Sequence, residues 1–196
     1  NKAEFFFSQA IVKRAEANVS DKGQVAADYN DFANFCKDTL HDFSKAEKLY
    51  MLGLQSAKKV NDSARISLIN INLGNASLQQ QKFKEAHYYF NTALQSLKLH
   101  PAPGYADNPA SESILLIGNK GYVLDILTGK TNLLLEEYKR NKNRQYLNAC
   151  LKTAKLADTV LSFIRHEQTG EQSKLYWRNY TRDFFTAAME ASYLAD

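Results

Sequence analysis

The stretch that decides the fold is residues 62–99, DSARISLININLGNASLQQQKFKEAHYYFNTALQSLKL. Apolar side chains recur in it at intervals of three and four residues, the period that places them on one face of an α-helix. Asp62 can cap a first helix that runs to about Gln81, and a second helix is expected from Lys84 to Lys98. The stretch therefore predicts two helices joined by a short turn.

The second of these helices carries a small residue, an aromatic residue four positions on, and a small residue three further. The same spacing occurs three times, at offsets of 43 and 40 residues, in Ala3/Phe7/Ala10, Ala46/Tyr50/Gly53 and Ala86/Phe90/Ala93. Positions four and three apart lie on one helix face, where small side chains let a neighbouring helix approach and the aromatic ring fills the space beside it. The spacing therefore predicts a repeated helical hairpin.

The order of residues in the same stretch resembles the signature of the tetratricopeptide repeat. The matching positions are Leu73-Gly74, Phe83, Ala86, Phe90, Ala93-Leu94 and a trailing proline. Asn70 and Ser77 depart from the signature, because the family favours Trp or Leu at the first position and a large aromatic residue at the second. The resemblance implies an all-α, right-handed solenoid of antiparallel helix hairpins, with about seven long helices and a short helix in an insertion.

Residues 1–196 are expected to form a single repeat domain, and the chain does not begin with Met, so we expect a fragment of a larger protein. Its parts are a half repeat at 1–20, a repeat at 24–60, the best repeat at 62–99, an insertion at 101–121, a long hairpin at 122–168 and a terminal helix at 172–196. Ser44-Lys45-Ala46-Glu47 is expected to act as a capping box. Asn108-Pro109 can start the short helix of the insertion.

Four strings in the second half carry a further resemblance: LDILTGKTNLLL from Leu124, LAD from Leu156, IR from Ile164 and SKLYWR from Ser173. They are similar to bacterial multidomain proteins in which a tetratricopeptide region precedes a caspase-like CHAT domain. The resemblance implies a protease-like domain beyond Asp196 that holds the family's catalytic His and Cys. It carries no catalytic residue onto this chain.

Charge and hydropathy argue against two classes of partner. The formal net charge is +4, from 25 basic and 21 acidic residues spread over both halves, so no nucleic-acid partner is expected. No apolar run approaches the roughly 18 residues of a transmembrane helix, so no membrane partner is expected. Cys36 and Cys150 lie in apolar helical patterns, which predicts buried thiols and a cytoplasmic location.

No motif predicts catalysis, a cofactor or a metal site. Gly129-Lys130-Thr131 is the nearest approach, but a phosphate-binding loop needs a glycine at position 124, where Leu124 stands. We expect this tripeptide to form a solvated turn of a helix. The four histidines contain no i, i+4 pair that could bind zinc, and His87 is expected on an exposed helix face. The chain is therefore not expected to be an enzyme.

Two surfaces are candidates for protein contacts. By the resemblance, the first helix of each hairpin lines a concave groove, which places Leu68, Ile71, Asn72, Asn75 and Gln79 there. Amide side chains donate and accept hydrogen bonds, so they suit the backbone of an extended peptide. The alternative is that these asparagines lie on a solvated face and bind nothing. On the terminal helix, which is apolar nearly all round, we expect an outer face for a second copy or a downstream domain, formed by Tyr176, Tyr180 and Phe184.

The sequence thus predicts a non-enzymatic scaffold for protein–protein interaction, as a regulatory or substrate-recruiting region of a multidomain protein. Its partner would be a protein or peptide, among them its own C-terminal domain, and a homodimer through the terminal helix is also expected. Two alternatives stay open. The groove could bind a small molecule or act as an enzyme, for which titratable residues should converge in a pocket, or the chain could be a structural spacer.

Overall fold

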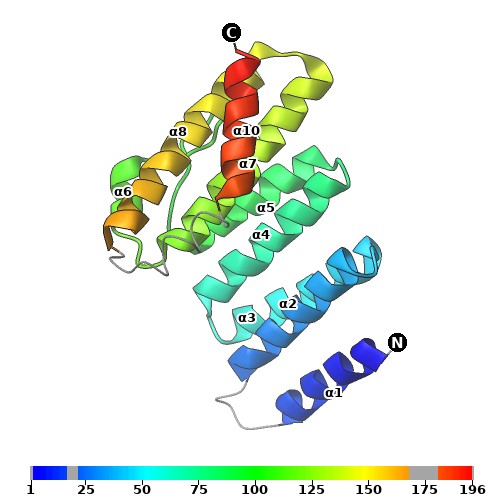
Figure 1. Ribbon diagram of the computed structural model, residues 1–196. Helices are drawn as coiled ribbons and strands as arrows, with labels where there is room; N and C mark the ends of the chain where they lie inside the picture. Colours follow the sequence, from blue (N-terminus) through cyan, green and yellow to red (C-terminus); the bar gives the residue numbers. More distant parts are fainter. Residues whose placement is uncertain (1, 17–21, 168–180, 196) are drawn as a thin grey trace.

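The structure is a computed structural model that describes residues 2–16, 22–167 and 181–195. Within these ranges all the regular elements are helices and none is a strand. The expected all-α fold class is therefore confirmed. Figure 1 shows the helices in sequence order from one end of the molecule to the other, most of them beside the helix that follows.

The described helices are α1 (Lys2–Glu16), α2 (Lys22–Asp38), α3 (Phe43–Lys59), α4 (Ser63–Gln79), α5 (Phe83–Ser96), α6 (Ser111–Leu115), α7 (Lys120–Asn141), α8 (Arg144–Glu167) and α10 (Arg182–Tyr193). Of these, all but α6 have twelve residues or more, which makes eight long helices in the described ranges rather than about seven. The short helix of the insertion is present, but it begins at Ser111 and not directly after Asn108.

Three pairs of consecutive helices make the most extensive contacts: α2 with α3, α4 with α5, and α7 with α8. Each pair then packs on the next, because α3 contacts α4 and α5 contacts α7. At the two ends, α1 lies against α2, and α10 lies across α7 and α8 (Figure 1). The hairpins therefore pack in series, and α4 contributes buried residues to the core on both of its sides, with Ile69 and Leu73 in one cluster and Ile71 in the next.

Three consecutive turns share one backbone conformation at intervals of 20 residues. His41, Asn61 and Gln81 have φ angles of 54°, 52° and 57°, in the left-handed region. After the second of these turns, the N–H of Asp62 donates to the carbonyl oxygen of Ala57 at 3.0 Å, which closes the end of α3 in the manner of a helix C-cap. None of the three residues is glycine, the residue that most often adopts this conformation, so the sequence did not predict the recurring turns.

Aspartates cap two of the helices that follow these turns. The Asp62 carboxylate accepts a hydrogen bond from the N–H of Arg65 at 3.0 Å, which confirms the predicted cap of α4. At α3 the cap is Asp42, which accepts from the N–H of Lys45 at 2.9 Å. The predicted capping box that begins at Ser44 is wrong, because the helix starts one residue earlier, at Phe43.

The small–aromatic–small pattern of α5 lies at the centre of the described structure. Ala86, Phe90 and Ala93 are fully buried. The Phe90 ring lies against two glycines of other helices, because a Cβ atom built on Gly74 of α4 would lie 2.7 Å from its Cε1 atom, and one built on Gly129 of α7 would lie 2.4 Å from its Cζ atom. Both distances are too short for a real contact, so α4 and α7 approach this ring only because they have no side chain there.

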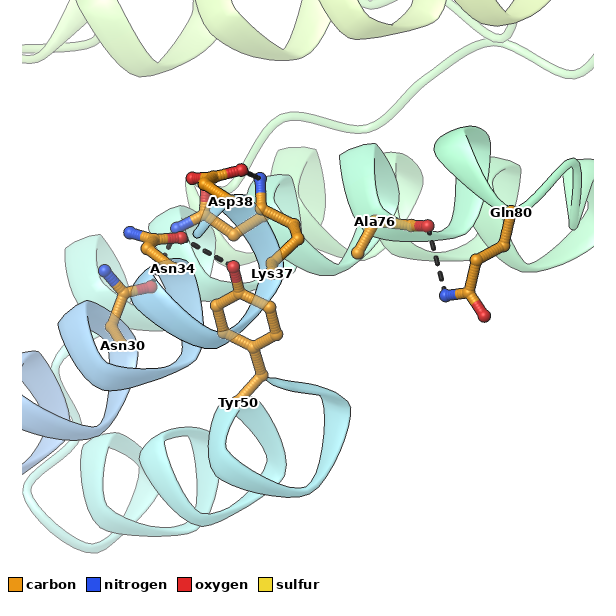
Figure 2. Close-up of polar contacts among 8 residues, drawn as sticks. Asn30, Asn34, Lys37, Asp38, Tyr50, Ala76 and Gln80 are labelled. Atoms are coloured by element: carbon orange, nitrogen blue, oxygen red, sulfur yellow. Dashed lines mark hydrogen bonds and ion pairs between the residues drawn. The ribbon is translucent and has the colours of Figure 1, made fainter. Parts of the chain in front are cut away.

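The same pattern in α3 uses a different contact. Tyr50, which stands 40 residues before Phe90, is also fully buried. Its hydroxyl donates to Oδ1 of Asn34 at 2.5 Å, and Asn34 stands 40 residues before Gly74 (Figure 2). At this position the α2–α3 hairpin thus has a hydrogen bond, where the α4–α5 hairpin has the contact between an aromatic ring and a glycine.

In α1 the aromatic residue of the pattern, Phe7, packs on two rings of α2, Phe32 and Phe35. The Phe7 ring stacks on Phe32 of α2, with 5.0 Å between ring centroids and 5° between planes. Phe5 and Phe6 expose 60% and 58% of their surface. Part of the apolar surface of α1 is therefore uncovered by the residues that the structure describes.

Replacing Gly129 with alanine is expected to lower the free energy of unfolding by about 1–3 kcal/mol, the usual cost of overpacking a core. The new methyl group would overlap the buried Phe90 ring, which outweighs the better helix propensity of alanine. Urea denaturation followed by circular dichroism would measure the change. Gly118→Ala is the control, because no atom lies within 4 Å of a Cβ at that position. Equal stability of both variants would contradict the packing described for Phe90.

Candidate functional site

A cleft of about 610 Å³ lies between α4 and α7. All five residues predicted to face a groove line it: Leu68, Ile71, Asn72, Asn75 and Gln79. Its volume falls within the range of about 300–1,000 Å³ that is usual for ligand pockets. The helical spacing of these residues thus places them together on one wall of the cleft.

The α4 wall combines a buried apolar residue with three amide side chains that are partly buried or exposed. Ile71 is 3% exposed, Asn72 and Asn75 are partly buried, and Gln79 is exposed. Asn72 does not simply lie on a solvated face, because its Nδ2 donates to Oδ1 of Asn30 in α2 at 2.7 Å. This hydrogen bond joins two hairpins along the same side of the molecule.

The opposite wall belongs to α7, and the sequence analysis did not identify it. Asp125, Thr128, Asn132 and Glu136 line the cleft at the spacing of one helix face. The signal was present in that spacing, but nothing local showed that α7 would lie opposite α4. Gly129 makes the approach possible here too, since a Cβ built on it would lie 3.2 Å from Oδ1 of Asn75.

The lining of the cleft also includes charged groups of both signs. Lys37 of α2 is 8% exposed and pairs with Asp38, with 3.1 Å between nitrogen and oxygen (Figure 2). Asp125 and Glu136 come from α7. Burial raises the pKa of the Asp125 carboxyl to about 7, so both of its protonation states are populated near neutral pH. The walls therefore offer amides, one ammonium group and two carboxyl groups over an apolar floor.

The outer face predicted for the terminal helix is not formed by Phe184. This side chain is 2% exposed and packs in the same core cluster as Phe90, because α10 turns it towards α7 and α8. Tyr176 and Tyr180 lie outside the described residues. The large apolar side chains that α10 does expose are Met189 and Tyr193.

Gly129-Lys130-Thr131 is not a solvated turn, and that prediction is wrong. Lys130 and Thr131 are fully buried in the middle of α7. The Lys130 ammonium donates to Oδ1 of Asn91 at 2.9 Å and to the carbonyl oxygen of Asp107 at 2.5 Å. Burial lowers the pKa of Lys130 to about 8, while attraction to Asp107 opposes the change. The lysine ties the 101–121 insertion to α5 and α7.

His87 was expected on an exposed face and is instead partly buried against α7. Its Nε2 lies 2.7 Å from Oε2 of Glu137, a side chain that is only 9% exposed. The prediction failed because α5 packs on α7 as well as on α4. The histidine therefore links two hairpins.

The cysteines are buried, as expected. Burial raises the pKa of the Cys36 thiol, and it raises that of Cys150 to about 12, so neither forms the nucleophilic thiolate readily. In residues 2–16, 22–167 and 181–195, no three side chains of His, Cys, Asp or Glu lie together as metal ligands would. No helix in these ranges combines the length and apolar character needed to cross a membrane.

Comparison of the chain with protein-family models, with curated proteins and with solved structures found no match in any of the three.

Lys130→Met offers a test of the buried ammonium group. An unfolded chain holds the lysine proton up to about pH 10.4, whereas the folded chain releases it from about pH 8, so the unfolded state binds more protons between these values. The free energy of unfolding of the wild type should accordingly rise relative to that of the variant, by about 2–3 kcal/mol over this interval.

Urea denaturation at a series of pH values from 7.5 to about 10.5 would measure the difference. Lys155→Met is the matched control, because Lys155 is exposed on α8. A difference between wild type and Lys130→Met that stays constant across the series would show that Lys130 is not a desolvated cation.

Proposed function

We propose that the chain is a non-enzymatic scaffold that binds an extended segment of a protein partner in the cleft between α4 and α7. The observation that carries this proposal is the presence of amide side chains on both walls of the cleft. Asn75 from α4 and Asn132 from α7 line its two walls. A carboxamide donates and accepts at once, so the two walls suit the N–H and C=O groups of an extended backbone.

The apolar floor supports the same function. Leu68, Ile71, Leu78 and Leu124 line the cleft along with the amides. Successive side chains of an extended segment point to opposite sides, so every second one would contact this floor. From Asn72 to Gln79 the α4 wall is about 10 Å long, at 1.5 Å per residue, which matches roughly three residues of an extended segment.

A right-handed, tetratricopeptide-like solenoid is the finer architecture that we propose. Support comes from the hairpins packed in series and from the turns at His41, Asn61 and Gln81, which recur every 20 residues. Helices α2, α3 and α4 have 17 residues each. Similar helices joined by similar turns produce a regular rotation from hairpin to hairpin, and such a rotation creates a concave side. The similarity of the second half to regions that precede CHAT domains stays a prediction.

The double variant with Asn75→Ala and Asn132→Ala is expected to bind a peptide with an affinity about 10- to 30-fold lower than that of the wild type. Each lost hydrogen bond is worth roughly 1 kcal/mol. Asn72 is left unchanged, because it bonds to Asn30 and its loss would also affect folding. Peptides would be selected from a random displayed library against the wild-type chain, and their affinities measured by fluorescence anisotropy.

Gln95→Ala, on the exposed side of α5, is the control and should leave the affinity unchanged. Circular dichroism should show equal helicity in all three proteins. The proposal fails if the selection yields no peptide, or if the selected peptides bind the double variant as tightly as they bind the wild type.

A further inference from the structure

The charged side chains that α7 contributes to the lining of the cleft are both acidic. Asp125 and Glu136 lie on the same helix face as Thr128 and Asn132. Asp125 is partly buried and lines the cleft, so a bound segment can reach its carboxyl group. About 10 Å along the helix, at 1.5 Å per residue, separates it from Asn132, one of the amides proposed to bind a partner's backbone. An extended segment spans this distance with about three residues.

The basic side chain of the described lining is already neutralised. Lys37 of α2 pairs with Asp38, with 3.1 Å between nitrogen and oxygen (Figure 2). The opposite wall, from α4, contributes no charged side chain to the part of the lining that the structure describes. Neither α2 nor α4 therefore offsets the negative charge on the α7 wall.

The end of the cleft at Glu136 keeps a negative charge in spite of a nearby lysine. The Lys139 ammonium lies 2.9 Å from a carboxylate oxygen of Glu136 and 2.8 Å from one of Glu190 on α10. One positive charge shared between two carboxylates leaves one negative charge at this end. The summed charges set the potential that an approaching segment meets, so the cleft favours a cationic segment.

The surroundings of Asp125 make its carboxyl group responsive to a cation. Burial removes water from the group and raises its pKa to about 7, which disfavours the carboxylate in the free chain. A cation placed beside the group would favour the carboxylate again. A carboxylate accepts several hydrogen bonds, so a cation can be added to the contact that Asp125 makes within the chain.

Few other titratable groups face Asp125 across the cleft. In the described lining they are Lys37 from α2 and Glu136 from α7 itself. The residues from α4 are amides and apolar side chains, and Thr181 precedes α10. Arg182, the first residue of α10, is exposed and is not part of the lining. Helices α5, α6 and α8 also contact α7 but contribute none of the described lining.

We propose that the segment bound in this cleft carries a lysine or arginine side chain that pairs with the Asp125 carboxylate. The inference rests on the proposed binding of an extended segment, and it specifies the charge of that segment. Both side chains have a long apolar stem and a charged end. The stem would pack on the apolar floor at Leu124, and the charged end would reach Asp125.

This pair would make binding depend on pH. A cation beside Asp125 lowers the carboxyl pKa in the complex below the value of about 7 in the free chain. Near pH 7 the free chain therefore holds more protons than the complex, and binding releases the difference. Affinity should accordingly rise with pH, by about tenfold between about pH 6 and about pH 8.

The probes are short linear peptides without histidine, selected from a random displayed library against the wild-type chain at about pH 8. They should be enriched in lysine or arginine relative to the unselected library. Fluorescence anisotropy at about pH 6 and about pH 8 would measure the Kd of the tightest peptide. Asp125→Asn should bind it at least about fivefold more weakly than the wild type at about pH 8, and its affinity should change less than about twofold with pH.

Asp158→Asn is the matched control, because Asp158 is exposed on α8 and does not line the cleft. This variant should bind as the wild type does at both pH values. Replacing the basic residue of the peptide with glutamine should weaken binding to the wild type about fivefold or more. The same replacement should have little effect on binding to Asp125→Asn, since the pair is already lost in that variant.

Calorimetry of the wild type in phosphate and in Tris at about pH 7 should show the release of about half a proton for each peptide bound. No proton release, selected peptides without a basic residue, or equal affinities of Asp125→Asn and the wild type would overturn this inference alone. The proposed function would stand in each of these cases if Asn75→Ala with Asn132→Ala still weakened binding of the same peptides. A selection that yields no peptide would overturn both proposals.

Discussion

The contact of the Phe90 ring with two glycines is the constraint on which the described core depends. Gly74 brings α4 against one part of the ring and Gly129 brings α7 against another, so a single side chain of α5 sets the distance between three helices. The same glycine of α7 leaves room for Asn75 beside it. The separation of the two walls of the cleft therefore follows from a packing requirement in the core.

Periodicity in the sequence was enough to predict which residues of a helix are buried and which share one face. The small–aromatic–small positions of α3 and α5 are buried, and the five residues from Leu68 to Gln79 line one cleft, since both features follow from helix geometry alone. The residues at which helices begin and end were predicted less exactly. The capping residue of α3 was placed two residues late, at Ser44 in place of Asp42, because both residue types can cap a helix.

The errors share one physical cause. Lys130, His87 and Phe184 are all covered by segments that are distant in the sequence: the insertion, α7, and the helices under α10. A local pattern shows which face a side chain occupies but not what arrives later to cover that face. A charged residue on a helix is usually solvated, so the burial of Lys130 could be expected only after the insertion was known to pack there.

The bond between Lys130 and the insertion has an evolutionary consequence. The ammonium group is tolerable in the interior because the carbonyl group of Asp107 and the amide of Asn91 surround it. A descendant that shortened the insertion would leave a bare positive charge inside the protein, and one that lost the lysine would leave the loop without its anchor. Natural selection should therefore treat the two as one inherited character, gained together and discarded together.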